Sequence, residues 1–144
     1  MENSAARFLG ATARRFPEKI AVEDEHGTLT WWELEGVAMA LASGVLARKI
    51  GPNRPILVYL PKSRESVVSF LGALYAGCPY APVDCAVPLG RLERTVENLE
   101  PALVVTDREG LARLAELDLR GAEAVLYEDL IAHPVNQAAV AAAL

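Results

Sequence analysis

The chain has 144 residues, the length of one domain, with 52% hydrophobic and 23% charged residues. This balance is typical of a folded protein and excludes an intrinsically disordered one. The formal net charge is −5 and the 14 basic residues are scattered, so we expect no nucleic-acid partner. The N-terminus does not read as a secretory leader, and no apolar run approaches the roughly 20 residues that span a bilayer. We therefore expect no membrane association and a cytoplasmic location.

The cysteines and histidines predict neither a disulfide framework nor a metal site. Cys78 and Cys85 are too few for such a framework, and their separation does not match metal-ligand spacing. His26 and His133 lie far from both in the sequence. Structural or simply exposed roles are therefore expected for all four residues.

The first predicted element is a helix from Ser4 to Arg15, with Ser4 as its N-cap and Pro17 closing it. One helical face carries Ala5, Phe8, Leu9 and Thr12. Two short strands follow, with Ile20, Val22 and Asp24 on one face of the first. They join around His26-Gly27, which predicts a β-hairpin.

The string from Leu29 to Leu34 predicts where the next helix begins. Thr30 and Glu33 fit a capping box, in which each side chain accepts a hydrogen bond from the other residue's backbone N–H. Leu29 and Leu34 are placed to form a hydrophobic staple across the same turn. The helix is expected to end near Gly51-Pro52. Its apolar positions at helical spacing are Leu34, Val37, Ala38, Leu41 and Val45.

From there strands and helices alternate, which predicts an α/β fold with a mostly parallel sheet flanked by helices. The predicted strands are Ile56–Leu60, a short extended segment at Pro79–Val83, Ala102–Thr106 and Ala124–Tyr127. The predicted helices run from Ser63 to Gly77, from Pro88 to Pro101, and from the Asp107 cap through Leu111, Leu114 and Leu117. Residues 133–144 form either a terminal helix or a linker.

In parallel sheets, ligands bind outside the carboxyl ends of the strands. The residues expected there are Pro61-Lys62-Ser63-Arg64, Asp84-Cys85 and Thr106-Asp107. Lys62 and Arg64 could bind an anion, but a solvated loop with Ser63 as a helix cap is the favoured interpretation. For Asp84 a turn is favoured over a ligand contact, and for Asp107 a helix cap.

Recognisable catalytic and cofactor motifs are missing from the chain. Gly72 and Gly77 have the spacing of a phosphate loop, but the required Lys-Ser/Thr does not follow them. There is no GxGxxG motif and no nucleophile elbow. Trp31 and Trp32 could stack on bases, but packing in the core or against the hairpin is favoured. We therefore predict no catalytic, cofactor-binding or metal-binding residue in this chain.

Two strings in this order, LTWWEL (Leu29–Leu34) and LYAGCPYAPVD (Leu74–Asp84), resemble the first two motifs of AMP-forming adenylating enzymes. That superfamily includes acyl-CoA synthetases, peptide-synthetase adenylation domains and D-alanine–carrier-protein ligases. The resemblance extends over about residues 5 to 130 and implies the N-terminal subdomain of that fold. The positions that carry it are Leu29, Thr30, Glu33, Leu34, Ala76, Gly77, Tyr80, Pro82 and Asp84. The resemblance implies structural roles for them and no catalytic one.

Within the family, Tyr80, Pro82, Val83 and Asp84 look like the pattern of the amino-acid-activating branch. Cys85 stands where peptide synthetases usually have proline, and the run from Val83 to Pro88, with Arg91 beyond, is similar to D-alanine–carrier-protein ligases. The chain departs from the usual motifs at Trp31, where tyrosine is usual, and at Tyr75, where lysine is usual. An amino-acid-activating parent of one of these two types is therefore expected.

The resemblance implies that the parent protein uses ATP and Mg²⁺ to make an acyl-adenylate, which a carrier protein or coenzyme A then accepts. The family's phosphate loop, adenine strand, ribose contact and catalytic lysine would all follow Leu144. This chain alone is therefore expected to bind no cofactor and to be inactive, with the remainder of the adenylation domain as its partner. Self-association through the face that the remainder would cover is also expected. The alternative is a free-standing α/β module for ligand binding or protein interaction.

Overall fold

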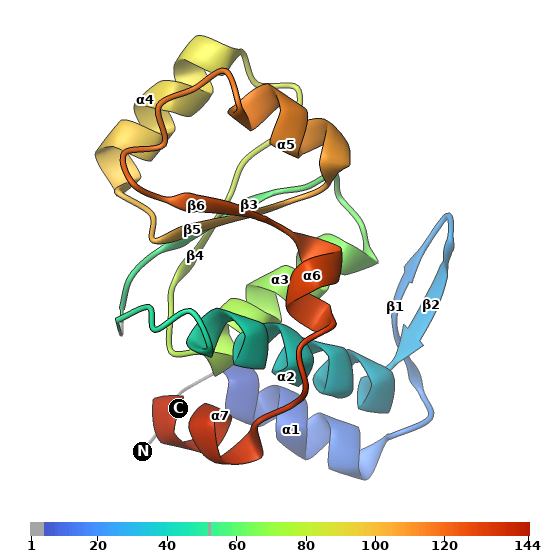
Figure 1. Cartoon of the computed structure of the whole chain (residues 1–144). Helices are drawn as coiled ribbons and strands as arrows, with labels where there is room; N and C mark the ends of the chain where they lie inside the picture. Colours follow the sequence, from blue (N-terminus) through green and yellow to red (C-terminus); the bar gives the residue numbers. More distant parts are fainter. Residues whose placement is uncertain (1–4, 52) are drawn as a thin grey trace.

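The computed structural model describes residues 5–51 and 53–144, which form an α/β fold with a separate hairpin (Figure 1). The helices are α1 (Ala5–Arg15), α2 (Trp31–Leu46), α3 (Arg64–Tyr75), α4 (Leu89–Leu99), α5 (Arg108–Leu114), α6 (Tyr127–Ile131) and α7 (Gln137–Ala143). The strands are β1 (Ile20–Asp24), β2 (Gly27–Thr30), β3 (Ile56–Tyr59), β4 (Tyr80–Pro82), β5 (Leu103–Thr106) and β6 (Glu123–Leu126).

The predicted parallel sheet is confirmed, with the strand order β4-β3-β5-β6 and every neighbouring pair parallel. Side chains of β3 alternate between its two faces, because successive residues of a strand point in opposite directions. Ile56 and Val58 face one core cluster, and Leu57 and Tyr59 face the other. Helices α4 and α5 cover one face of the sheet, while α2, α3 and α6 lie on the other, with α1 and α7 beyond them (Figure 1).

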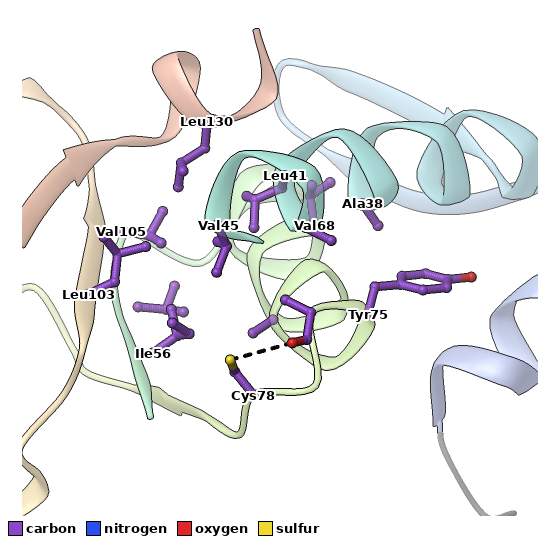
Figure 2. Packing of buried hydrophobic residues seen from close by; sticks show 14 of the residues in the cluster. Ala38, Leu41, Val45, Ile56, Val68, Tyr75, Cys78, Leu103, Val105 and Leu130 are labelled. Carbon is purple, nitrogen blue, oxygen red and sulfur yellow. Dashed lines mark hydrogen bonds between the residues drawn. The ribbon is translucent and has the colours of Figure 1, made fainter. Parts of the chain in front are cut away.

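The larger cluster joins this second group of helices to the sheet, as Figure 2 shows. Leu41 and Val45 of α2 lie among Val68 of α3, Leu130 of α6 and residues of β3 and β5. Cys78 belongs to this cluster, and its Sγ lies 3.6 Å from the Ala76 carbonyl oxygen. Cys78 is therefore a buried core thiol, while Cys85 is half-buried at the other cluster.

The predicted capping box at the start of α2 is confirmed. The Thr30 hydroxyl accepts a hydrogen bond from the Glu33 N–H at 3.2 Å, and a Glu33 carboxylate oxygen accepts one from the Thr30 N–H at 3.0 Å. Leu34 is buried and Leu29 packs against the same cluster, as a hydrophobic staple requires. The sequence therefore specifies the start of this helix correctly.

The expected end of α2 near Gly51-Pro52 is wrong, because the helix stops at Leu46. Beyond it the N–H groups of Arg48 and Lys49 bind carbonyls three residues back, so the last turn tightens and closes. Lys49 then takes a positive φ of 56°, which no helix continues through. Pro52 lies outside the described residues.

The face of α1 expected from the sequence is not the one that the fold buries, and the two faces share only Leu9. Its buried residues are Ala6, Leu9, Gly10 and Ala13. Phe8 is 68% exposed, and α1 packs against α2 and α3. The predicted cap Ser4 lies outside the described residues.

The C-terminal part contains one helix that the sequence pattern did not predict. The predicted strand at Ala124–Tyr127 is β6, but Tyr127 already begins the short helix α6. Of the two alternatives for residues 133–144, the structure has a helix, α7, capped by the Asn136 side chain. The Asn136 N–H also binds the Ser43 hydroxyl of α2 at 2.9 Å, which joins this segment to the body of the fold. No helix in the described part of the chain is long and apolar enough to cross a membrane.

Candidate functional site

A cleft of about 650 Å³ lies at the carboxyl ends of β3, β5 and β6, the predicted place for a ligand. Its walls are residues 60–63 after β3, 106–109 around the end of β5, and 126–128 at the end of β6. The tip of the hairpin, residues 24–26, adds a fourth wall. The structure therefore brings together two of the three predicted segments. The third, Asp84-Cys85, is not part of the cleft lining.

Two of the helix N-termini at this cleft, those of α3 and α5, are capped by the chain's own side chains, whereas that of the short helix α6 has no side-chain cap. The Ser63 hydroxyl accepts a hydrogen bond from the Ser66 N–H at 3.2 Å at the start of α3. An Asp107 carboxylate oxygen accepts one from the Gly110 N–H at 2.8 Å at the start of α5. Both favoured interpretations, Ser63 and Asp107 as helix caps, are confirmed. The Ser66 and Gly110 N–H groups therefore already have acceptors within the chain and are not free to bind an anion.

Asp24 connects the hairpin to α3 at the edge of the cleft. One of its carboxylate oxygens accepts hydrogen bonds from the His26 and Gly27 N–H groups at 2.8 and 3.1 Å, which closes the hairpin turn. The other accepts one from the Arg64 N–H at 2.9 Å, and the Arg64 Nε lies 3.1 Å from the carboxylate. Only 14% of the Asp24 side chain is exposed. The Arg64 guanidinium thus pairs within the fold, which disfavours the anion-binding alternative for this residue.

The bonded environment of Asp24 favours its charged form. Hydrogen bonds from the Arg64 and His26 N–H groups, together with the Arg64 guanidinium, lower the pKa of Asp24 to about 2 against the opposing effect of burial. In the unfolded chain an aspartate has a pKa of about 4. The charge on Asp24 therefore stabilises the folded state above about pH 4, and this contribution is lost as the pH falls from about 4 towards 2.

We expect the substitution Asp24→Asn to lower the thermal midpoint at pH 7, because an amide cannot pair with the Arg64 guanidinium. The difference from the original chain should shrink as the pH falls through this window, since the aspartate then becomes neutral too. Thermal unfolding followed by circular dichroism between pH 7 and pH 2 measures both effects. Asp129→Asn, on an exposed residue of α6, is the control. An equal effect of the two substitutions would contradict the role of Asp24.

The Asp84 loop is shaped from outside by an arginine that the sequence did not reveal. An Asp84 carboxylate oxygen accepts a hydrogen bond from the Ala86 N–H at 2.8 Å, so the favoured interpretation as a turn is confirmed. Arg113 of α5 donates to the carbonyl oxygens of Cys85 and Val87, and its guanidinium carbon lies 5.8 Å from the centre of the Tyr59 ring. No sequence signal marks Arg113, because its partners lie in a distant loop.

Carboxylates dominate the charge of the cleft lining. The acidic lining residues are Asp24, Glu25, Glu65, Asp107, Glu109 and Glu128, and the basic ones are Lys62 and Arg108. Arg108 pairs with Glu128 at 3.1 Å. The second basic residue of the lining, Lys62, is exposed. Burial and the charge of Glu65 raise the pKa of the Tyr127 phenol to about 12, so it stays neutral. Among the described residues no His, Cys, Asp and Glu side chains gather as a metal site would require.

The predicted motif positions lie where they shape the backbone. Ala76 is buried at the end of α3, and Gly77 takes a φ of 74°, which turns the chain towards β4. The Tyr80 ring stacks on Phe70 with the ring centres 4.5 Å apart, and Pro82 pairs with Val58 in the sheet. Three of these positions, Thr30, Glu33 and Asp84, accept hydrogen bonds from backbone N–H groups through their side chains.

The two tryptophans of the first motif differ in their surroundings. Trp31 packs against the larger core cluster, as predicted. Trp32 is 64% exposed, so core packing is wrong for this residue. Neighbouring residues of a helix point about 100° apart, so only one of the two can face the core.

Comparison with known proteins places this geometry among adenylating enzymes. The profile of the family described as AMP-binding enzyme matches residues 9–142. Syringomycin synthase SyrB1 of Pseudomonas syringae pv. syringae is 32% identical over 127 residues, which are 88% of this chain and 20% of that protein. The chain thus spans about a fifth of that relative's length.

Solved structures share the fold. A nonribosomal peptide synthetase, FmoA3 (S1046A), superimposes with a TM-score of 0.79 and 29% identity over 90% of this chain and 14% of its own. VinN, solved in complex with 3-methylaspartate, gives a TM-score of 0.82 at 22% identity over 98% of this chain and 37% of its own. In each case the chain corresponds to a minor part of a larger protein.

Proposed function

This chain belongs to the family of AMP-binding enzymes, and from that premise we propose that it is a scaffold piece which needs further chain to bind ATP. In this proposal the whole protein uses ATP and Mg²⁺ to convert a carboxylate into an acyl-adenylate, and this chain supplies helices and strands to that domain. Its partners would be the remainder of the adenylation domain and the acceptor of the acyl group, a carrier protein or coenzyme A. We place the reaction in the cytoplasm.

The observation that carries the proposal is the charge of the cleft. A triphosphate needs clustered N–H donors, guanidinium groups or ammonium groups, as in all phosphate sites. Here the N-termini of α3 and α5 are capped by Ser63 and Asp107, Arg64 is paired with Asp24, and six carboxylates line the wall. The excess of carboxylates over basic groups in this lining would repel ATP rather than hold it. In this proposal the donors for the phosphates come from other parts of the adenylation domain.

The substrate class we propose is a small amino acid. Two findings support it: the likeness to the nonribosomal peptide synthetase FmoA3, and the run Tyr80, Pro82, Val83 and Asp84, which resembles the amino-acid-activating branch. The acyl pocket of the family is built from later residues, so this part of the proposal does not rest on the cleft.

Titration calorimetry of the chain with Mg·ATP tests the scaffold proposal. We expect no saturable heat, because the cleft repels the phosphates, while an intact peptide-synthetase adenylation domain in the same buffer should bind. Saturable binding of Mg·ATP by this chain would overturn the proposal.

The substrate is tested separately by ATP–pyrophosphate exchange on a whole protein that includes this chain, with amino, fatty and aryl acids. Exchange with a small amino acid is expected, and a preference for fatty or aryl acids would refute that class.

A further inference from the structure

A second cavity, of about 540 Å³, lies between α1, α2, the end of α3 and α7. Two of these helices, α1 and α7, lie on the side of α2 and α3 that is away from the sheet (Figure 1). Arg14 of α1, Glu35 and Met39 of α2, and Tyr75 of α3 line it, and Val140 and Leu144 add apolar surface. Its lining shares no residue with the first cleft.

Three polar groups in this cavity face one point above Gly10. A Cβ atom on Gly10 would lie 3.4 Å from Glu35 Oε1, 3.5 Å from Arg14 Nη1 and 3.7 Å from the Tyr75 hydroxyl oxygen. They come from three different helices, and the missing side chain of Gly10 leaves the space between them. Yet no ion pair joins Arg14 to Glu35 among the described residues.

Tyr75 lines this cavity and is the most buried of the three. Tyr75 belongs to the larger core cluster and lies at its edge, with the ring pointing away from β3 and β5 (Figure 2). The residue is only 4% exposed, and its buried hydroxyl forms no hydrogen bond of standard geometry, although the Glu35 carboxylate lies close enough to interact with it and raises its pKa. Buried hydroxyl groups are nearly always hydrogen-bonded in folded proteins. Such a group beside guanidinium and carboxylate side chains is suited to a further polar partner.

The charges select the class of ligand. Arg14 offers a guanidinium, which matches a carboxylate, and Glu35 offers a carboxylate, which matches an ammonium group. Arg7 of α1 adds a second guanidinium to the lining. A phosphate dianion would pair with the guanidinium groups, but Glu35 would repel it and would be left without a cationic partner. We propose that this cavity binds a small zwitterion, with its ammonium group on Glu35 and its carboxylate on Arg14 and the Tyr75 hydroxyl. The apolar side chains of Met39 and Val140 would contact the remainder of the molecule.

The test is an NMR titration of the ¹⁵N-labelled chain with L-alanine, which carries both charges. We expect saturable shifts centred on Gly10, Glu35 and Tyr75. Acetate and methylammonium, each with one of the two charges, should give only weak, unsaturated shifts at equal ionic strength. Equal binding of acetate, or shifts scattered over the surface, would overturn the proposal. The result of this titration is independent of the proposed function, because the experiment contains no ATP and measures no adenylation.

Two variants and a control separate the site from general effects on the fold. Glu35→Gln keeps the size but removes the charge, and should weaken L-alanine binding about tenfold, since a charge-assisted bond is lost. Tyr75→Phe removes only the hydroxyl and should weaken binding severalfold with an otherwise unchanged spectrum. Glu116→Gln, exposed beyond α5 in the opposite layer, should leave binding unchanged. Unaltered affinity in both Glu35→Gln and Tyr75→Phe would refute the assignment.

Discussion

Replacing Gly44 by alanine should lower the free energy of unfolding by about 2–3 kcal/mol, because the site has no room for a methyl group. An added Cβ would lie 2.6 Å from the carbonyl oxygen of Leu130 and 3.1 Å from its Cα. Both are backbone atoms of α6, so no side chain can move aside. Helix α6 would have to shift from α2, opening the core around Leu41, Val45 and Leu130 (Figure 2). Urea denaturation followed by circular dichroism measures the loss.

Gly36 provides the matched control within the same helix. It is exposed, and an added Cβ there would meet nothing within 4 Å. Gly36→Ala should therefore raise the free energy of unfolding by up to about 1 kcal/mol, the usual helix preference for alanine over glycine. Opposite signs for the two substitutions would establish that α6 packs on α2 at Gly44. A stabilising Gly44→Ala would contradict that close contact.

These two glycines also show what the sequence could predict and what it could not. The capping box at Thr30 and Glu33 is a local pattern, and the apolar strands Ile56–Tyr59 and Leu103–Thr106 are recognisable because both of their faces are buried. Nothing local distinguishes Gly44 from Gly36. Only α6 does so, and this five-residue helix is too short to show a helical period.

The candidate site also has features that the sequence predicted and features that it did not. Its position followed from the parallel sheet, and the caps Ser63 and Asp107 followed from their place before a helix. The hydrogen bond that Asp24 accepts from the Arg64 N–H of α3 and the one that Arg113 donates to the Cys85 carbonyl oxygen join residues far apart in the chain. Such pairs depend on the tertiary fold. The acidic side chains of the cleft also come from separate segments, so the sequence alone did not predict that carboxylates dominate its lining.

The second large effect is expected at the wall of the cleft, where Gly110 of α5 meets the end of β5. A Cβ on Gly110 would lie 2.0 Å from the Thr106 hydroxyl oxygen and 3.1 Å from Cδ2 of Tyr59. Thr106 cannot simply turn away, because it is fully buried and its hydroxyl donates to the Tyr59 carbonyl oxygen at 2.8 Å. Gly110→Ala should therefore cost about 1–3 kcal/mol of unfolding free energy.

A double-mutant cycle with Thr106→Ala tests the cause of that loss. Thr106→Ala alone should cost about 1–3 kcal/mol, because the hydrogen bond to Tyr59 is lost. In the Thr106→Ala background, however, Gly110→Ala no longer meets a hydroxyl, so its cost should fall by at least about 1 kcal/mol. Urea denaturation of the four proteins gives the coupling directly. Additive costs would mean that the clash with Thr106 is not what excludes a side chain at Gly110, and that contact with Tyr59 is. Coupled costs would instead show that one hydroxyl sets the spacing between β5 and α5, and with it the position of Asp107 in the cleft wall.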